Sequence, residues 1–396
     1  MIRVAYICAD PGIPVFGTKG ASVHVQAMLG AFRRAGADVT LFTPRLGGEP
    51  PPAFADLAVQ PLPEAGKGDA GVRERRLLAA NRSLRRVLRD SGPFDLVYER
   101  YSLWSHAGME QAAASGATGV LEVNAPLIEE QSRHRTLVYT DGATAVARRA
   151  FAAASTLVAV SPGVADYLAE FPQAAQRIRV VPNGIDPQRF PASLLRQRQA
   201  AASNGKPFTV GFLGTLKPWH GVDLLLSAFA RLAIADQALR LLIVGDGPER
   251  ARLEDAVNRQ GLGSRVRFVG AVKPDDVPGW LADMDIGVAP YPAMRCFYFS
   301  PLKIHEYMAA GLPVVASRVG HLDQVVADGR TGLLYPAGDV EALSRAILRI
   351  RLDAALRERL GTEARSHVLR RHDWAAVAAE VLSLAAAPGR DRWVAQ

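Results

Sequence analysis

The sequence has few cysteines and no long apolar run. Its two cysteines, Cys8 and Cys296, fit neither a disulfide framework nor a metal-ligand spacing, which favours a reducing compartment. No apolar run reaches the roughly 18 residues of a membrane helix, and the uncharged stretch 150–165 is interrupted by Pro162. Ile2–Ala9 is too short for the apolar part of a signal peptide. These absences predict a cytoplasmic protein without a membrane span.

Short β-branched runs alternate with longer amphipathic stretches along all 396 residues. A chain of this length exceeds one ordinary core, so two domains are expected. Continuous apolar runs are typical of parallel strands buried on both faces. Stretches with helical spacing, for example Val222–Ala235 and Ala342–Leu360, fill the gaps, and this alternation predicts α/β domains with doubly wound sheets. The predicted strands are Ile2–Ala9, Val39–Thr43, Phe94–Tyr98, Thr118–Val123, Thr156–Val160, Ile178–Val181, Phe208–Leu213, Leu239–Val244, Val266–Val269, Ile286–Ala289, Pro313–Ala316 and Gly332–Leu334.

The polar segment 193–206 lacks a clear period and contains Asn-Gly near its end, which is typical of a linker. We therefore predict a first domain over 1–192, the linker 193–206, a second domain over 207–370, and a C-terminal return helix and tail over 371–396. The return helix is expected to pack on the first domain. Two such sheets facing a central cleft would bind ligands at the carboxyl ends of their strands.

In each half of the chain, one glycine-rich turn follows the first predicted strand. Neither GxGxxG nor GxxxxGK[ST] occurs, which argues against a dehydrogenase and a Walker loop. Gly17–Ser22 can still present backbone N–H groups to an anion at a helix start, although a plain tight turn explains it equally well. In Gly214–Gly221, Lys217 can supply a charge to phosphate and His220 a hydrogen bond. The alternative there is a surface turn in which Trp219 packs.

The segment Phe299–Met308 reads as the start of a helix. Ser300 suits the N-cap and Pro301 the first helical position. The free N–H groups and Lys303 can then face a diphosphate or sugar hydroxyls. Glu306 lies about one turn further along, where a carboxylate can accept two ribose hydroxyls. A glutamate that faces only solvent is the simpler alternative.

Five sequence blocks, in order, resemble retaining glycosyltransferases of family 4, also called glycosyl transferases group 1, which have the GT-B fold of two Rossmann-like domains. These blocks are Val181–Asp186, Val244–Pro248, Val266–Gly270, Glu306–Ala316 and Gly329–Leu334. The Lys-Pro-Trp-His-Gly and Ser-Pro-Leu-Lys signatures further resemble a recurring subgroup.

The resemblance implies a retaining, metal-independent hexosyltransferase that needs no cofactor. Its donor would be a UDP-, GDP-, ADP- or dTDP-sugar and its acceptor a hydroxyl of a glycan, glycolipid or small molecule. We expect catalytic roles for Lys217, Lys303 and Glu306, with Glu306 on the ribose. The expected substrate contacts are Gly17, Gly20, Ala21, His24, Glu122, Asn124, Gly214, Thr215, His220, Gly245, Val272, Tyr298, Phe299, Ser300, Pro301 and Leu302.

The sequence departs from the family pattern at several of these positions. Tyr298 stands where the family often has the first of two glutamates, and Thr215 where an arginine is common. His220 stands where the family has a second basic residue, a lysine. Lys217 is therefore the substitute candidate for neutralising the diphosphate. Asn124 replaces a frequent histidine, so the acceptor hydroxyl would be held by Glu122, Asn124 or Glu129.

Other acceptor-side residues carry less weight. His24 either points into the cleft or packs between helices. Asp10 and Arg100 follow strands, and the run 98–101 (Tyr-Glu-Arg-Tyr) either stacks a sugar or contributes half-buried tyrosines.

Two other functions remain open. A sugar-nucleotide epimerase on the same fold would need paired acid and base carboxylates, and no such pair accompanies Glu306. A noncatalytic nucleotide-sugar-binding protein is suggested by Tyr298. Nucleic-acid binding is not expected, because basic and aromatic residues do not interleave.

The whole chain has a net charge of +8, and the positive excess of its first half lies in one predicted helix. Residues 1–190 carry 21 basic and 18 acidic side chains, and Arg73–Asp90 alone has seven arginines. Leu77, Leu84 and Leu88 fall on one face of that helix. An anionic membrane surface is therefore a candidate partner, which would make the protein peripheral on the inner face of the membrane. A solvated helix packed through its leucines is the alternative.

Overall fold

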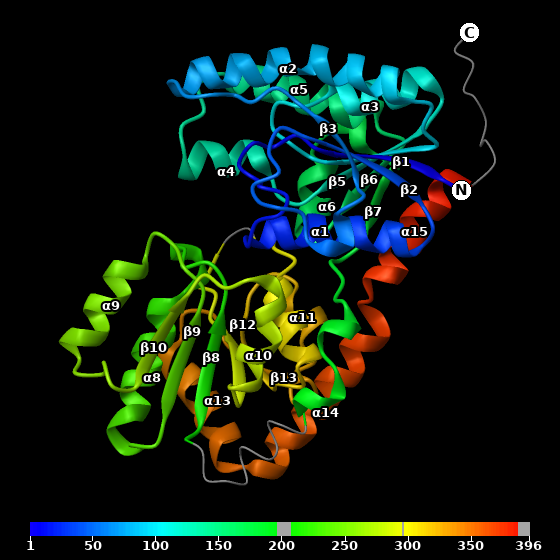
Figure 1. Cartoon of the computed structure of the whole chain (residues 1–396). Coiled ribbons are helices and arrows are strands. Elements are labelled where there is room, and N and C mark those ends of the chain that lie inside the picture. The colour runs from blue at the N-terminus through cyan, green and yellow to red at the C-terminus, as the bar shows by residue number, and fades with distance from the viewer. Residues whose placement is uncertain (196–206, 295–296, 387–396) are drawn as a thin grey trace. The chain divides into compact units, whose positions relative to one another are not determined.

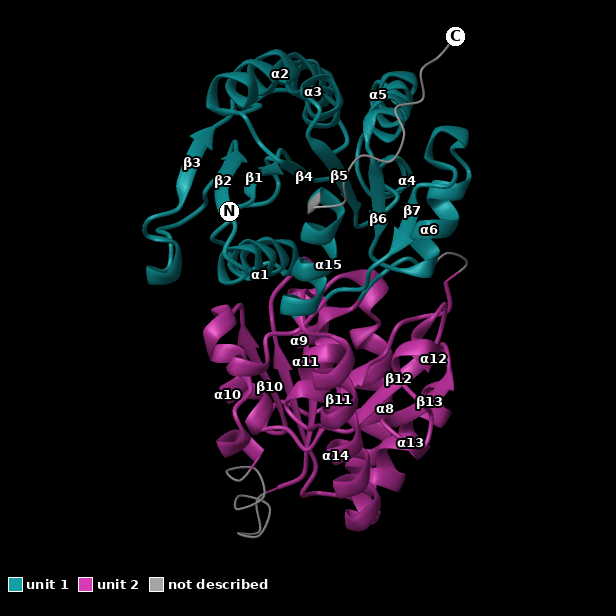
Figure 2. Cartoon of the chain, turned by 90° about the vertical axis from the view of Figure 1, so that its right-hand side faces the viewer, with its two compact units in different colours: residues 1–183, 298–300, 374–396 teal, residues 184–297, 301–373 magenta. Residues whose placement is uncertain are grey.

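The computed structural model describes residues 1–195, 207–294 and 297–386 (Figure 1). Residues 196–206 of the predicted linker, Cys296 and the tail 387–396 lie outside the described residues. The chain divides into two compact units (Figure 2). The first contains 1–183, 298–300 and 374–396, and the second 184–297 and 301–373.

The first unit is built on a seven-stranded parallel sheet with the order β3-β2-β1-β4-β5-β6-β7. Helices α2, α3 and α5 cover one face of this sheet, and α1 and α15 lie on the other (Figure 1). Its strands are β1 Arg3–Cys8, β2 Asp38–Thr43, β3 Ala58–Pro61, β4 Leu96–Arg100, β5 Thr118–Val123, β6 Thr156–Ala159 and β7 Ile178–Val180. Its helices are α1 Gly20–Arg34, α2 Ala70–Ser91, α3 Ala107–Ser115, α4 Leu127–His134, α5 Thr140–Ala153, α6 Pro162–Ala169 and α15 Trp374–Ala386.

Alternate residues of the strands fill the two sides of this sheet. Ala5 and Ile7 of β1 join the apolar cluster under α2, α3 and α5. Tyr6, between them, points to the opposite face and packs its ring against Phe32 of α1 and Tyr98 of β4. Burial on both faces explains why β1 reads as a continuous apolar run.

The second unit has a six-stranded parallel sheet with the order β10-β9-β8-β11-β12-β13. Its strands are β8 Thr209–Leu213, β9 Arg240–Val244, β10 Val266–Gly270, β11 Ile286–Ala289, β12 Val314–Arg318 and β13 Gly332–Pro336. Its helices are α8 Val222–Ala235, α9 Arg250–Arg259, α10 Val277–Ala282, α11 Leu302–Ala309, α12 Leu322–Val325, α13 Val340–Leu352 and α14 Ala354–Arg371. Strands β8, β9 and β11 share a core with α8, α13 and the start of α14.

The predicted fold class is confirmed, and each of the twelve predicted strands has a counterpart within about two residues. The C-terminal helix belongs to the first unit, as expected, and packs against α1. One short strand, β3, is absent from the prediction. The single helix predicted over Ala342–Leu360 is two helices, because the Asp353 carboxylate accepts the Leu356 N–H at 2.8 Å and starts α14.

Residues 184–192 cluster with the second unit, although the sequence pattern groups them with the first domain. The Ile185 N–H donates to the His372 carbonyl at 2.6 Å, and Arg365 donates to the Phe190 carbonyl at 2.6 Å. These partners are far along the chain, so a local pattern does not report them. In the described parts of the chain, no helix is both long enough and apolar enough to cross a bilayer.

Candidate active site

The strand order of the second unit changes direction between β8 and β11, the kind of position where open parallel sheets bind ligands. The loops that follow these two strands carry most of the predicted donor-side residues. Tyr307 of α11 spans the point where the strands stop pairing: its hydroxyl accepts from the Leu213 N–H at 2.7 Å and donates to the Val288 carbonyl at 3.3 Å. This tyrosine, which sequence reasoning missed, anchors α11 at the switch point.

Lys303 on α11 is buried at this point without a hydrogen-bond partner among the described residues. Its ammonium nitrogen lies 4.4 Å from the Phe212 ring centroid and 5.2 Å from that of Tyr291. Burial lowers the pKa of Lys303 to about 7, although the neighbouring Glu306 opposes the shift. The ring faces and the attraction of Glu306 do not offset the burial of this ammonium, since its pKa is still lowered, so an anion arriving here would stabilise it.

Two glycine-containing turns leave space beside the Lys303 ammonium, because glycine has no side chain. The ammonium nitrogen lies 3.0 Å from the place where a β-carbon of Gly214 would stand. A β-carbon on Gly245 would lie only 2.0 Å from the Gly214 carbonyl oxygen, and Gly245 also has φ +137°. The turns after β8 and β9 therefore touch backbone to backbone, which only glycine permits.

His220 closes the same turn from the other side. Its Nδ1 contacts the Thr215 carbonyl oxygen, and its ring lies 5.9 Å from that of Tyr291. Burial lowers the pKa of His220 to about 3, and the Lys303 charge adds to the shift. A carbonyl can only accept, so Nδ1 carries the proton and Nε2 the lone pair. In this form His220 offers an acceptor through Nε2, whereas the sequence suggested a donor.

Lys217 in the same turn is half-buried, with its ammonium 5.4 Å from the Trp219 ring centroid. Trp219 thus packs against its neighbours in this turn, as the alternative interpretation expects, and the phosphate role of Lys217 stays a prediction. Thr215 is half-buried and is tied to this arrangement through its carbonyl.

Glu306 lies on α11 one turn beyond Lys303 and is 8% exposed. Burial raises its pKa, and Arg189, whose guanidinium lies 3.6 Å from the carboxylate, opposes that shift. Arg189 also donates to the Pro274 carbonyl. A glutamate facing only solvent is thus excluded. Sequence reasoning missed Arg189 because it falls in the segment grouped with the first domain.

The predicted N-cap of α11 is wrong. The helix begins at Leu302 with Pro301 at the N-cap, and no side chain caps it. Ser300 instead belongs to the first unit, where its hydroxyl oxygen accepts from the Asn183 N–H at 3.2 Å and its carbonyl accepts from the Asn183 amide at 2.9 Å. The first-turn N–H groups of α11 consequently lack a side-chain cap.

In the first unit, the loop after β1 leads into α1. Gly17 sits in a tight turn, with its N–H donating to the Pro14 carbonyl at 3.0 Å and its own carbonyl accepting from the Gln26 amide at 3.0 Å. Helix α1 has no side-chain cap, and no atom lies within 4 Å of where a Gly20 β-carbon would stand. Gly20 and Ala21 thus form an open helix start.

Glu122 of β5 is the centre of a buried polar network. His24 Nε2 lies 2.9 Å and an Arg100 nitrogen 3.6 Å from its carboxylate oxygens, and the Asn124 amide donates to it at 2.9 Å. Burial alone would raise the pKa of Glu122, but His24, Arg100 and Asn124 together bring it down to about 2. Both carboxylate oxygens are therefore engaged by protein groups.

His24 is 2% exposed and meets the Trp374 ring of α15 edge-on, with centroids 5.1 Å apart. This packing matches the second of its two sequence-based readings. The sugar-stacking reading of the run 98–101 is wrong, because Tyr98 and Tyr101 are buried and present no ring face.

Tyr298 and Phe299 cluster with the first unit, and their rings are in contact at a tilt of 41°, with centroids 4.4 Å apart. The Tyr298 hydroxyl donates to Glu130 at 3.3 Å, and its carbonyl accepts from the Ser161 hydroxyl at 2.6 Å. Burial raises the pKa of Tyr298, so it remains a neutral phenol.

The predicted site residues therefore fall into two groups. Gly17, Gly20, Ala21, His24, Glu122, Asn124, Tyr298, Phe299 and Ser300 belong to the first unit, and Gly214, Thr215, Lys217, His220, Gly245, Val272, Pro301, Leu302, Lys303 and Glu306 to the second. No group of three His, Cys, Asp or Glu side chains suited to a metal ion occurs in residues 1–195, 207–294 and 297–386.

Two doubly wound parallel sheets in one chain, with the C-terminal helix returning to the first, define the GT-B class. Sucrose-phosphate synthase from Thermosynechococcus elongatus shares this fold with a TM-score of 0.75 and 23% identity, over 97% of this chain and 98% of that chain. HepE from Anabaena, solved in complex with UDP and glucose, gives 0.72 and 20%, over 97% and 99%.

Family models identify the two halves. The model described as Glycosyltransferase Family 4 matches residues 18–189, and the one described as Glycosyl transferases group 1 matches 207–353. The chain thus belongs to the family 4, group 1 glycosyltransferases of the GT-B fold.

Among curated relatives, 2-deoxystreptamine glucosyltransferase from Streptomyces kanamyceticus is 33% identical over 54% of this chain and 55% of that protein. Phosphatidyl-myo-inositol mannosyltransferase from Mycobacterium leprae is 34% identical over 51% of each. These matches span about half the length of each relative. D-inositol 3-phosphate glycosyltransferase from Saccharomonospora viridis is 28% identical over 89% of this chain and 86% of that protein.

Proposed function

We propose that the chain transfers a sugar from a nucleotide-diphosphate donor to a hydroxyl acceptor, with retention at the anomeric carbon and without a metal. The observation that carries this proposal is Lys303, a buried ammonium without a hydrogen-bond partner in the described structure, on the same helix as the buried Glu306. A diphosphate beside Lys303 and a ribose beside Glu306 would satisfy both groups. A nucleoside diphosphate presents these two features in one ligand.

Each residue of the second unit has a defined role in this proposal. Lys303, Lys217 and the uncapped N–H groups at Leu302 hold the diphosphate. The Gly214 and Gly245 turns let its oxygens approach the backbone, and Val272 lines the base. Glu306, oriented by Arg189, accepts the ribose hydroxyls, and His220 contacts the donor sugar.

The reaction breaks the bond between the anomeric carbon and the leaving phosphate oxygen and forms a bond from that carbon to the acceptor oxygen. The acceptor proton passes to the departing phosphate, in the front-side route that the family resemblance implies. Lys303, Lys217 and the helix start stabilise the charge that develops on the leaving diphosphate, a preorganised electrostatic role.

Acceptor binding is proposed for the first unit, through the open start of α1 at Gly20 and Ala21 and through Asn124. Since both Glu122 oxygens are engaged by protein groups, its proposed role is to orient Asn124 and His24. The names of three relatives contain 2-deoxystreptamine, myo-inositol and inositol 3-phosphate. These are hydroxylated six-membered rings, which supports a ring-shaped hydroxyl acceptor. The subgroup with the Lys-Pro-Trp-His-Gly and Ser-Pro-Leu-Lys signatures stays a prediction.

Calorimetry with UDP, GDP, ADP and dTDP in EDTA tests donor binding. We expect one nucleotide to bind wild type, and Lys303→Met and Glu306→Ala to weaken it at least tenfold, while Lys273→Met, an exposed lysine of the same unit, changes nothing. Binding that is equal in all four proteins would overturn the assignment.

Turnover is tested with the matching nucleotide sugar. Lys217→Ala or Lys303→Met should lower the rate of donor hydrolysis on the order of 10²–10³-fold if either lysine stabilises the transition state. NMR of the first-formed sugar reports its anomeric configuration, and inversion would refute retention. A bound donor that is never cleaved or transferred identifies a noncatalytic protein, and a donor that changes its sugar identifies an epimerase.

A cytoplasmic location and peripheral membrane docking through Arg73–Asp90 also remain proposals. The leucine face of this helix is packed, since Leu84 and Leu88 lie in the core with α3. Docking would therefore rest on the exposed arginines. Flotation of wild type with phosphatidylglycerol vesicles, but not with phosphatidylcholine vesicles, is the expected result.

A further inference from the structure

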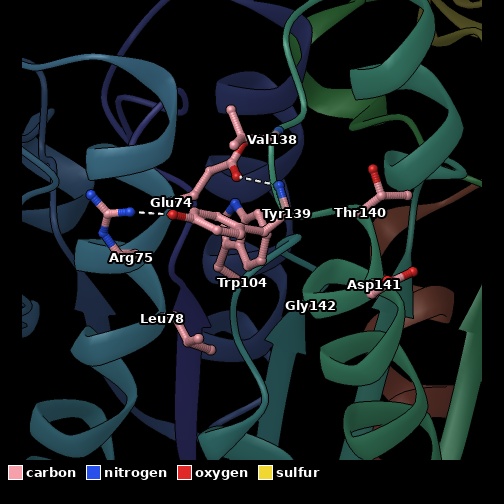
Figure 3. Close-up of a pocket in the computed structure, with 9 residues that line it drawn as sticks. All are labelled: Glu74, Arg75, Leu78, Trp104, Val138, Tyr139, Thr140, Asp141 and Gly142. Atoms are coloured by element: carbon pink, nitrogen blue, oxygen red, sulfur yellow. Dashed lines mark hydrogen bonds between the residues drawn. The ribbon is translucent and has the colours of Figure 1, made fainter.

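A pocket of about 590 Å³ opens in the first unit between α2 and the start of α5 (Figure 3). Arg75 and Leu78 reach it from α2, and Thr140 and Asp141 from α5, with the rings of Trp104 and Tyr139 between them (Figure 3). Trp104 lies in the loop after β4, which puts the pocket near the carboxyl edge of the sheet. A volume of this size suits one small molecule.

The apolar part of the lining is unusually exposed. Leu78, Val138 and Tyr139 are 39%, 50% and 38% exposed, and they are three of the eight large hydrophobic side chains that the structure describes as exposed. Trp104 is 6% exposed and forms part of the wall. Exposed apolar side chains gathered around one hollow are typical of ligand-binding sites.

Buried polar groups of α2 hold both walls in place. The Glu74 carboxylate accepts the Val138 N–H at 3.0 Å and the Tyr139 N–H at 2.9 Å. Two turns further along α2, the Asn81 amide donates to the Trp104 carbonyl at 2.8 Å. Contacts within the protein therefore fix both walls, and a preorganised pocket lowers the entropy cost of binding a ligand.

The polar groups at the rim favour a neutral, hydroxylated ligand. Arg75 contacts the Tyr139 hydroxyl and lies on one side, while Asp141 and Thr140 are exposed on the other. The lining has one basic side chain, Arg75, and two acidic ones, Glu74 and Asp141, so it gives no net attraction for an anion. The Glu74 carboxylate already accepts two backbone N–H groups, which leaves Asp141 as the carboxylate that can meet a ligand. A carboxylate, a guanidinium and a hydroxyl together can accept and donate hydrogen bonds to several hydroxyls.

Gly142 keeps the pocket open. A β-carbon there would make ordinary contacts, 3.5 Å from the Tyr139 β-carbon and 3.7 Å from the Trp104 ring. A larger side chain would therefore extend over the Trp104 ring and occupy the space that a ligand needs.

We infer that this pocket binds a neutral polyhydroxylated six-membered ring, either a sugar or a cyclitol, as the acceptor-side subsite; this assignment of its role rests on the proposed transferase function. The C–H face of such a ring would pack on Leu78, Val138 and the aromatic rings. Its hydroxyls would meet Asp141, Thr140 and Arg75.

Saturation-transfer NMR on the full chain, without donor, tests the inference. The probes are methyl α-D-glucopyranoside, methyl α-D-mannopyranoside and myo-inositol, compared with sorbitol and cyclohexanol. We expect at least one ring polyol to receive saturation and the open-chain sorbitol to receive none. Response of the glycosides alone identifies a sugar subsite, and response of myo-inositol alone identifies a cyclitol subsite. Saturation of cyclohexanol without any polyol, or of no probe, overturns the inference.

Two variants locate the binding. Gly142→Leu and Tyr139→Ala should each weaken the response at least tenfold, and far-UV circular dichroism checks that each is folded. Val180→Ala, which truncates an exposed valine of β7 in the same unit, is the matched control and should bind like wild type. Wild-type binding by the folded Gly142→Leu variant overturns the placement.

Nucleotide titration of the same wild-type sample separates the two claims. If the nucleotide binds and no ring polyol receives saturation, the subsite is overturned and the proposed function is left intact. If a ring polyol receives saturation and no nucleotide binds, the assignment of the pocket is supported and the proposed function is contradicted.

Discussion

The buried ammonium of Lys303 has a measurable consequence for stability. In Lys303→Met the side chain keeps its length and its apolar stem but loses the amino group, which in the fold is either buried with its charge or, above its lowered pKa, has to give up its proton. We expect the ligand-free variant to be more stable than wild type at pH 8 and unable to bind nucleotide tightly. A residue that destabilises the fold while serving a site is a common arrangement in enzymes.

The magnitude follows from the pKa of Lys303. Burial lowers this pKa to about 7 in the folded chain, against the ordinary lysine value of 10.5 in the unfolded chain. Between these values the unfolded chain binds a proton that the folded chain does not, so the destabilisation is absent above pH 10.5, grows as the pH falls, and is complete below pH 7. At about 1.4 kcal/mol per pKa unit, it reaches about 3 kcal/mol at pH 8. For a unit of this size the melting temperature should rise by roughly 6–12 °C.

Urea unfolding and differential scanning calorimetry of the full chain at pH 7, 8, 9 and 10 measure this difference. Lys273→Met removes an exposed lysine of the same unit and should leave the unfolding free energy unchanged. The reasoning is refuted if Lys303→Met is no more stable than wild type at pH 8. It is equally refuted if the difference does not shrink between pH 8 and pH 10.

Three further predictions concern stability. Glu122 has its pKa lowered to about 2 from the ordinary glutamate value of 4.5, so its contribution of about 3 kcal/mol is present above pH 4.5 and lost as the pH falls toward 2. In urea unfolding, Glu122→Gln should remove this pH dependence. Gly245→Ala should destabilise the second unit by more than about 3 kcal/mol, because its φ is +137° and its β-carbon would collide with the Gly214 carbonyl, whereas Gly279→Ala has open space and should be near neutral by calorimetry. Asp353→Ala should cost about 1 kcal/mol in urea unfolding through loss of the N-cap of α14, and an unchanged midpoint would contradict that role.

Much of the fold could be predicted from the sequence because the relevant signals are local. β5, Thr118–Val123, and α8, Val222–Ala235, have the predicted bounds. The strand β3, Ala58–Pro61, was missed because it is a short edge strand, half-buried at most, so it lacks a continuous apolar run.

The sequence predicted which residues belong to the candidate site, but not which side chains they pair with. Lys303 and Glu306 stand out from their spacing after a strand, whereas Arg189, 117 positions before Glu306, has no local signal. The expected N-cap at Ser300 failed for the same reason: its hydroxyl and carbonyl bond Asn183, a partner that the pattern of 299–308 does not contain.

The sequence by itself determined the two doubly wound sheets, the glycine turns after their first strands and the family to which the chain belongs. Periodicity, turn chemistry and motif order are properties of neighbouring residues, so they can be read without coordinates. The tertiary structure decided which charges are left unbalanced. Lys303 lacks a hydrogen-bond partner within the described structure, while Glu122 has three polar neighbours, and both are buried. That difference depends on side chains brought together from distant positions, because burial and pairing are set by packing.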